Sequence, residues 1–313
     1  MHRCHVHQKL VRIVEGKRKI EGRNAMRWRG ERESDNVEDR RGMSMSRGVK
    51  VGGIGGLGLV AVVVIGMFLG VNPTDLLQGI SNMQDSSVSV DRQIGSPAAN
   101  DDMRKFVAVV LGETEDVWGA AFRQSGSTYH EPKLVLFSGA VESACGMAGS
   151  ATGPFYCPGD QKVYLDLSFF EEMRSRFGVS GDFAQAYVIA HEVGHHVQNL
   201  SGILGKVSQL QSRSSTTVKN RLSVMMELQA DCLSGVWAHQ ANKNRRILEA
   251  GDIEEGLNAA SAIGDDRIQK MSRGYVVPDA FTHGSAEQRV RWFKAGFEGG
   301  TIESCDTFNA DRL

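Results

Sequence analysis

Residues 51–71 form a run of 21 positions without a charged or strongly polar side chain. A helix of that length spans roughly 31 Å, which matches the hydrocarbon core of a lipid bilayer. The five glycines early in the run would destabilise a helix in water, but membrane-spanning helices tolerate glycine better. The run therefore predicts a single transmembrane helix over 51–71, in preference to a buried core helix, a glycine-rich linker or a cleaved signal peptide.

The charges of the chain are segregated around this run. Residues 1–50 hold 14 Lys+Arg and 7 Asp+Glu, a balance of +7, whereas residues 51–313 hold 22 and 30, a balance of −8. Cations directly before an apolar span mark its cytoplasmic side. We therefore expect a single-pass protein of the cytoplasmic membrane, with residues 1–50 as a basic cytoplasmic tail and a folded domain that is periplasmic or extracellular. Topology then explains the basic tail, so we expect no nucleic-acid partner.

The N-terminal part offers two further signals. Gly52 with Gly56, and Gly66 with Gly70, each form a G-x-x-x-G pair that can pack two helices closely, so a homodimer through the transmembrane glycines is an open alternative. Residues 1–25 precede Met26, a natural start, and are interpreted as an over-extended reading frame.

The composition changes again after the apolar run. Residues 72–101 are polar and predict a stalk, and residues 102–309 predict the folded domain. The expected fold class is α+β, a mostly helical domain with a small early sheet. Periodicity and capping residues predict helices over 106–122, 183–200, 218–240, 253–263 and after Ser285, strands over 133–137 and 161–167, and a flexible loop over 201–217.

Four cysteines follow the apolar run: Cys145, Cys157, Cys232 and Cys305. An oxidising compartment predicts two disulfides, for which three connectivities exist; four free thiols are the alternative. Cys145 and Cys157 flank a turn-rich loop, so we expect them to pair and to leave Cys232 with Cys305.

The helix predicted over 183–200 contains His191-Glu192-Val193-Gly194-His195. Imidazoles at i and i+4 share one helical face, so both can reach one cation, and neutral imidazole suits Zn²⁺. The carboxylate of Glu192 can take a proton from a metal-activated water and pass it to a leaving amine. The alternative is a helix with core or solvated histidines. An apolar stretch precedes the motif, which indicates a buried helix whose histidines need partners.

A third protein ligand is expected from the helix predicted over 218–240. Glu227 and Asp231 share a face there, among apolar neighbours. We predict that Glu227 binds the metal and that Asp231 accepts a hydrogen bond from a ligand imidazole, which fixes the ring. The alternative is a solvent-facing acidic pair.

Two other histidines are candidates for a role at the same site. His283 precedes the predicted capping box at Ser285 and is the candidate donor to an oxyanion, with a simple turn histidine as the alternative. His196 lies about 140° around the helix from His191 and is expected to make a hydrogen bond rather than bind the metal.

From Met26 to about Phe308 the chain resembles the putative neutral zinc metallopeptidase family, whose members are bacterial and membrane-anchored. The resemblance is carried by Met26-Arg-Trp-Arg-Gly30, the glycine-rich anchor, Phe155-Tyr-Cys-Pro158, His191-Glu-Val-Gly-His-His-Val-Gln198, Glu227-Leu-Gln-Ala-Asp-Cys232, Gly251-Asp-Ile-Glu-Glu255 and Thr282-His-Gly284.

The resemblance implies a zincin-like fold of the gluzincin type, with H-E-x-x-H and a downstream glutamate ligand. The arrangement of these motifs is also similar to that of integral-membrane zinc proteases, which carry a Thr-His-Pro segment whose histidine contacts the oxyanion. Here Gly284 stands where that segment has proline. In zincins the substrate commonly lies as an added strand against a sheet edge, and residues 161–167 are the expected edge.

These inferences combine into a hypothesis of a membrane-anchored, zinc-dependent endopeptidase that acts on a peptide or protein substrate outside the cytoplasmic membrane. His191, His195 and Glu227 bind Zn²⁺, and Glu192 and His283 are catalytic. Two alternatives stay open: a non-catalytic envelope-binding module with a structural zinc site, and a zinc hydrolase acting on peptidoglycan peptides.

Overall fold

The structure is a computed structural model that describes residues 26–42 and 101–313. The predicted transmembrane helix over 51–71, its paired glycines and the predicted stalk up to residue 100 lie outside the described residues, as do residues 1–25. None of the helices within 26–42 and 101–313 combines the length and hydropathy that a bilayer span needs.

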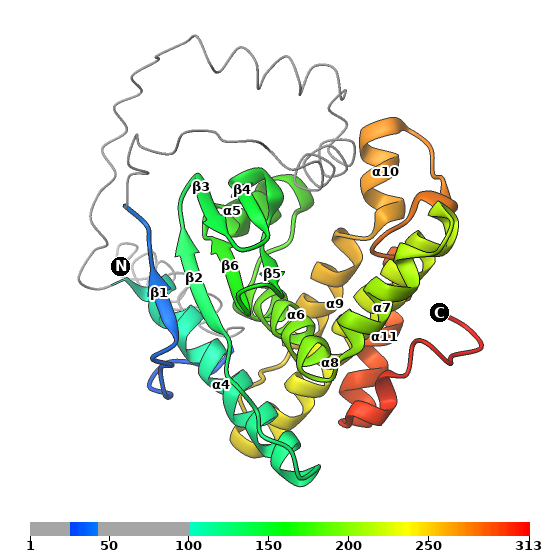
Figure 1. Cartoon of the computed structure of the whole chain (residues 1–313). Helices are drawn as coiled ribbons and strands as arrows, with labels where there is room; N and C mark the ends of the chain where they lie inside the picture. Colours follow the sequence, from blue (N-terminus) through cyan, green and yellow to red (C-terminus); the bar gives the residue numbers. More distant parts are fainter. Residues whose placement is uncertain (1–25, 43–100) are drawn as a thin grey trace, which may run out of the picture.

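A four-stranded sheet forms one side of the molecule, with the strand order β1-β2-β6-β5 (Figure 1). The first three strands run parallel, and the edge strand β5 is antiparallel to β6. A separate hairpin joins β3 to β4. The strands are β1 (Val37–Asp39), β2 (Lys133–Phe137), β3 (Ala140–Ser143), β4 (Gly146–Gly149), β5 (Phe155–Cys157) and β6 (Lys162–Asp166).

This sheet order corrects the predicted substrate edge. The strand expected over 161–167 is β6, which pairs with β2 on one side and β5 on the other, so it is not an edge. The edge strand next to β6 is β5, which lies within a stretch of small residues that gave no strand signal.

Eight helices complete the described part of the domain, which confirms a mostly helical α+β fold with a small sheet. They are α4 (Asp102–Gln124), α5 (Ser168–Phe177), α6 (Asp182–Leu200), α7 (Ile203–Ser212), α8 (Thr216–Arg245), α9 (Asp252–Ala262), α10 (Asp265–Arg273) and α11 (Ala286–Gly299).

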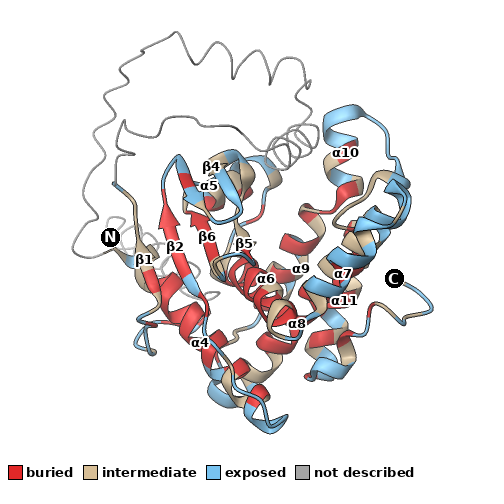
Figure 2. Ribbon diagram, viewed as in Figure 1, coloured by how far each residue is buried: buried red, intermediate tan, exposed pale blue. Residues whose placement is uncertain are grey.

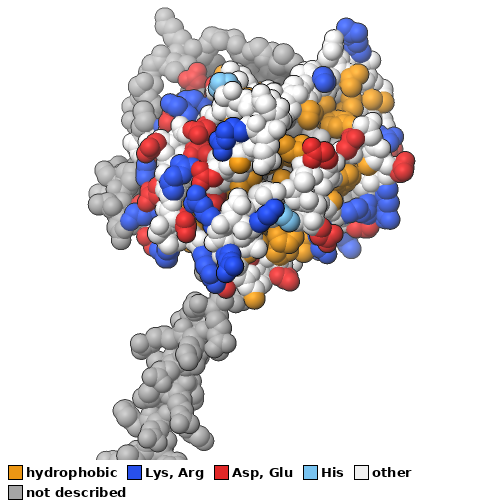
Figure 3. Space-filling view, turned by 90° about the horizontal axis from the view of Figure 1, so that it is seen from below, with side chains coloured by type: hydrophobic (Ala, Val, Ile, Leu, Met, Phe, Trp, Pro, Cys, Tyr) orange, Lys and Arg blue, Asp and Glu red, His pale blue; other side chains and the backbone are white. Residues whose placement is uncertain are grey.

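The centre of the fold is α6, which is buried over most of its length (Figure 2). Its first half, from Phe183 to Ala190, is apolar almost all round, and such a helix is stable only when other elements cover it. α4, α8 and α9 pack against it, and α11 packs against α8. Seen from below, charged side chains of both signs are dense on the left of the molecule, and on the right they surround patches of hydrophobic side chains (Figure 3).

Three helix predictions need correction. The segment 201–217, predicted as a flexible loop, contains α7, of which only Val207 is buried. α5 and α10 were not predicted, because few of their residues are apolar and buried. The residue preceding α6 is Gly181, with a φ of 119°, and the helix begins at Asp182, one residue before the predicted start. The capping box at Ser285 is confirmed, with Gln288 as its partner.

The boundary predicted for the cytoplasmic tail is wrong for residues 26–42, which belong to the folded domain. Met26, Trp28 and Val37 are buried in the main hydrophobic core, and β1 pairs with β2. These apolar residues lie among many charges, so composition alone assigned the whole segment to a solvated tail.

Both disulfides are present, Cys145 with Cys157 and Cys232 with Cys305. The first joins the end of the β3–β4 hairpin to β5. The second joins α8 to the short 3₁₀ helix Ile302–Cys305.

Candidate metal centre

The two helices that carry the predicted ligands approach closely at Gly194. A Cβ atom at this position would lie 3.1 Å from the carbonyl oxygen of Ala230 in α8 and 3.3 Å from its Cα. That is tighter than ordinary van der Waals contact, so glycine at this point lets α8 come near enough for its side chains to reach those of α6.

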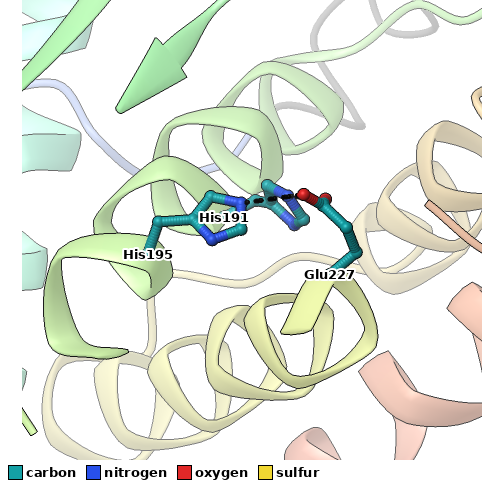
Figure 4. Close-up of side chains that lie close together, drawn as sticks. All are labelled: His191, His195 and Glu227. Carbon is teal, nitrogen blue, oxygen red and sulfur yellow. Dashed lines mark hydrogen bonds and ion pairs between the residues drawn. The ribbon is translucent and has the colours of Figure 1, made fainter. Parts of the chain in front are cut away.

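Three predicted ligands converge across this contact (Figure 4). One donor atom from each of His191, His195 and Glu227 lies within 4.8 Å of the other two. The Nε2 atom of His191 is 3.2 Å from Glu227 Oε2, and that of His195 is 3.6 Å from Glu227 Oε1. Two imidazole nitrogens and one carboxylate therefore face a common point, a donor set typical of zinc sites.

The other nitrogen of His191 is held by a buried ionic cluster. Its Nδ1 donates to Asp231 Oδ1 at 2.9 Å. Asp231 also accepts from Arg289 Nε at 2.8 Å and Nη2 at 2.9 Å, and from the Tyr187 hydroxyl. All four side chains are at least 92% buried. The cluster fixes the ring and directs its Nε2 towards Glu227, as predicted for Asp231.

The pKa values of this cluster follow from opposite charges in a dry environment. Burial alone would raise the pKa of Asp231, but Arg289 and His191 outweigh it and hold that pKa below its usual value. Burial would lower the pKa of His191, but its hydrogen bond and charge interaction with Asp231 raise it to about 10 in the metal-free protein.

His195 is held by neutral amides instead. Its Nδ1 donates to Gln198 Oε1 at 2.8 Å, which leaves Nε2 free to bind a metal. The Gln198 amide donates to the carbonyl of Met226 at 2.7 Å and to Gln229 Oε1 at 3.0 Å, so it bridges α6 to α8. Sequence reasoning missed Gln198, although its position three residues after a ligand histidine was a signal.

His283 lies on the loop before α11 and is positioned by Asp265. The backbone N–H groups of Thr282, His283 and Gly284 donate to Asp265 Oδ2 at 2.7, 2.6 and 3.0 Å. The ring Nδ1 of His283 is 3.4 Å from Asp265 Oδ1. Burial would lower the pKa of His283, but Glu227 and Asp265 outweigh it and raise that pKa. A fully buried aspartate thus fixes this loop.

The site opens into a cleft of about 730 Å³. Glu192 lines it together with the three predicted ligands and His283. The edge strand β5 contributes to the wall of the cleft. Most of the remaining wall is apolar: Phe155, Phe169, Phe177, Val188, Leu204, Val207, Met226, Ile263 and Ile268.

Comparison with known families decides what kind of protein has this site. The model of the family described as "Putative neutral zinc metallopeptidase" matches residues 26–308. The chain belongs to this family. The match begins at Met26 and therefore includes the N-terminal segment that packs into the domain.

Relatives of the chain occur in other bacteria. The "Uncharacterized protein YpfJ" of Escherichia coli (strain K12) is 51% identical over 292 residues, which cover 90% of this chain and 99% of the relative. The "Uncharacterized protein Rv2575" of Mycobacterium tuberculosis (strain ATCC 25618 / H37Rv) is 39% identical over 258 residues, which cover 79% of this chain and 86% of the relative. No solved structure matches the chain.

Membership of a zinc metallopeptidase family implies a zinc site. Within residues 26–42 and 101–313, the one group of His, Cys, Asp and Glu side chains close enough to hold an ion is His191, His195 and Glu227. The family and the geometry therefore indicate the same three residues as the zinc site.

His196, directly after the H-E-x-x-H motif, makes hydrogen bonds that connect α6 to other parts of the domain. His196 is fully buried, its Nε2 donates to the carbonyl of His130 at 2.6 Å, and its Nδ1 accepts from the Tyr156 hydroxyl at 3.0 Å. Burial lowers the pKa of His196, which favours the neutral ring that this pattern requires. Asn199 donates to the same hydroxyl at 2.9 Å. α6 is thereby tied to β5, so His196 fixes the wall of the cleft relative to the ligands.

Proposed function

We propose that this protein is a zinc-dependent endopeptidase that hydrolyses peptide bonds in the cleft between α6, α8 and β5. The observation that carries the proposal is the position of Glu192. It lines the cleft directly beside a three-donor site, where a purely structural metal site would need no extra carboxylate.

The residues present fit a zinc ion. His191 and His195 would each offer Nε2, because their Nδ1 atoms donate to Asp231 and Gln198. Glu227 would offer a carboxylate oxygen. Three protein ligands facing an open cleft match catalytic zinc sites, whereas structural sites are closed by a fourth protein ligand.

Zinc held there would supply a Lewis acid that lowers the pKa of water towards neutrality and polarises a carbonyl. Glu192 takes the proton of the attacking water and returns it to the leaving amine, a role typically worth 10²–10⁴ in rate. His283 donates to the oxygen on which negative charge develops. Asp265 holds that loop in place, so the donor does not reorganise during the reaction.

Peptide binding is supported by β5. As an edge strand, β5 has backbone groups that can pair with a substrate in extended form, while alternate side chains of that substrate enter the apolar cleft. A peptide or protein with bulky apolar residues near the cleaved bond is the substrate class that follows.

The two disulfides support action outside the cytoplasm, because such bonds persist in oxidising compartments. The apolar run 51–71 supports attachment to the cytoplasmic membrane.

The test compares two glutamates of the same cleft. Purified full-length protein is loaded with zinc and given a peptide library, cleavage is read by mass spectrometry, and bound zinc is measured by elemental analysis. Glu192→Gln should retain zinc and lose roughly 10²–10⁴ in rate. Glu172→Gln is the matched control, because Glu172 also lines the cleft but pairs with Arg176, and its rate should stay near wild type.

Wild-type protein that holds zinc but cleaves no member of the library would contradict the proposal. So would a Glu192→Gln variant as active as wild type. Cleavage confined to purified muropeptides would redirect the chemistry to peptidoglycan.

A further inference from the structure

The N-terminal segment 26–42 is an integral part of the domain. Trp28 is 7% exposed, its ring contacts that of Phe106 edge-on at 5.4 Å, and its Nε1 donates to Asp182 Oδ2 at 2.8 Å. Asp182 begins α6, so the segment reaches the helix that carries the metal-site histidines. The backbone N–H of Arg27 donates to the carbonyl of Ile247, between α8 and α9, at 2.8 Å.

The domain also contains a carboxylate whose partners come from this segment. Glu115 in α4 is 4% exposed. It accepts from the Ser34 hydroxyl at 2.5 Å, from Asn36 Nδ2 at 2.9 Å and from Arg32 Nη2 at 2.9 Å. Without the segment, a buried charge would lose all three of these contacts, at a large free-energy cost.

The backbone of residues 26–42 also packs closely against the rest of the domain. β1 pairs with β2 in parallel register, Val37 opposite Leu134 and Asp39 opposite Leu136. At Gly112 in α4, a Cβ atom would lie 3.0 Å from the carbonyl oxygen of Arg32, so the helix accommodates the segment only because a side chain is missing there. Residues 26–42 are therefore an integral part of the folded domain.

The described residues on either side of 43–100 meet each other. Arg41 Nη2 is 2.5 Å from Asp39 Oδ2 and 2.5 Å from Asp101 Oδ2. Asp101 caps α4 by accepting from the backbone N–H of Arg104 at 3.0 Å. The chain thus leaves the domain and returns to it at one place.

These contacts conflict with a single membrane crossing between residues 42 and 101. A single crossing would put β1 and β2 on opposite faces of the bilayer, and paired strands cannot be separated by about 30 Å of hydrocarbon. The two disulfides favour an oxidising compartment for the domain, and the paired segment must lie in the same compartment as the domain.

We propose that residues 26–42 lie outside the cytoplasm together with the metal-site domain, so that the chain makes no net crossing of the membrane between residues 42 and 101. Any attachment through the apolar run 51–71 is then to a lipid surface met from the domain's own side. This topology does not depend on peptidase activity.

The experiment labels single cysteines in intact cells that express the full chain, with Cys4→Ser to remove the thiol outside the disulfides. Glu33→Cys reports the N-terminal segment, and Glu254→Cys, also an exposed glutamate, reports the domain. A membrane-impermeant maleimide should label both to equal extents before lysis. Asp35→Cys, also exposed, repeats the measurement if Glu33→Cys fails to accumulate.

Labelling of Glu254→Cys in intact cells, with Glu33→Cys and Asp35→Cys labelled only after permeabilisation, would overturn the proposal. Protection of all three positions until lysis would overturn it as well, because the shared compartment would then be the cytoplasm. Non-reducing mass mapping of each variant verifies that both native disulfides have formed, so that only folded protein is scored.

Discussion

The two histidines of the metal site are held by different chemistry. His191 donates to a carboxylate that is itself paired with a buried guanidinium, so its surroundings are ionic. His195 donates to Gln198, an uncharged amide that is bonded to the backbone of α8 and to Gln229. Both arrangements leave Nε2 facing Glu227, so one geometry is reached in two ways.

This difference predicts what is lost when the partners of His191 (the ionic side) or of His195 (the amide side) are replaced. Inside a protein, loss of one partner of a buried ion pair leaves an uncompensated charge, whereas loss of an amide leaves unsatisfied dipoles. The ionic side should therefore dominate stability, and the amide side should mainly affect the orientation of its ligand.

The largest effect is expected for Asp231→Asn, which keeps an acceptor for His191 but removes the charge opposite Arg289. The metal-free protein should lose about 3–5 kcal/mol of unfolding free energy, because Arg289 remains buried and unpaired. Zinc affinity should fall about 10–100-fold. Denaturant unfolding and competition with a zinc chelator measure the two quantities.

Asp231→Leu combined with Arg289→Met is the control for this variant, since it removes both charges and keeps apolar volume. Stability should recover, while zinc affinity stays low because His191 has no acceptor. Recovery of zinc affinity as well would show that Asp231 does not orient the ligand.

A smaller effect is expected for Gln198→Leu. This side chain is fully buried, and its loss leaves the carbonyl of Met226 and the Nδ1 of His195 without this partner. A loss of about 1–3 kcal/mol in stability follows, with a fall in zinc affinity of roughly tenfold. If Gln198→Leu destabilises the protein as much as Asp231→Asn does, the distinction between the two sides fails.

Gly194→Ala acts on both sides at once, because it forces α6 and α8 apart by a few tenths of an ångström. We expect a stability loss of about 1 kcal/mol and weaker zinc binding, read from the same two assays. Gly205→Ala in α7 is the matched control: a Cβ atom there meets nothing within 4 Å, so it should be neutral or slightly stabilising. Equal behaviour of the two variants would disprove the close approach.

The smallest effect should come from Glu255, at the far end of α6 from the motif. It accepts from the backbone N–H of Phe183 at 3.2 Å, and burial together with Asp252 raises its pKa to about 7 from 4.5. A raised carboxyl pKa means that the folded state favours the protonated form, so the contribution of Glu255 to stability should be fully present below pH 4.5 and be lost as pH rises through 7. Thermal melts across this range should show the slope in wild type, and Glu255→Gln should flatten it without changing zinc affinity.

The sequence contained enough information to choose three candidate ligands that the fold brings together, because their signal is local. His191 and His195 are one helical turn apart, and Glu227 stands among apolar neighbours in a long helix, which indicated that its carboxylate was buried for a reason. The α+β class and the helices α6, α8 and α11 were recognisable from periodicity and capping for the same reason.

The parts that could not be predicted depend on contacts between distant residues. β1 is three residues long, and its partner β2 lies almost a hundred residues later in the chain. A strand this short shows no periodic pattern from which it could be predicted. β6 was recognised as a strand, but its interior place in the sheet depends on β5, which consists of three residues. Arg289 and Gln198 are ordinary polar residues until the fold brings Asp231 and His195 beside them.

Each disulfide ends on an element that shapes the cleft. Cys157 belongs to β5, and Cys232 follows Asp231 directly in α8. Under the proposed location outside the cytoplasm, a newly made chain in the reducing cytoplasm would lack both tethers, and its cleft would take its final form only after export. Under the proposed hydrolytic function, oxidation would then act as a maturation step that spares the proteins of the compartment in which the chain is synthesised.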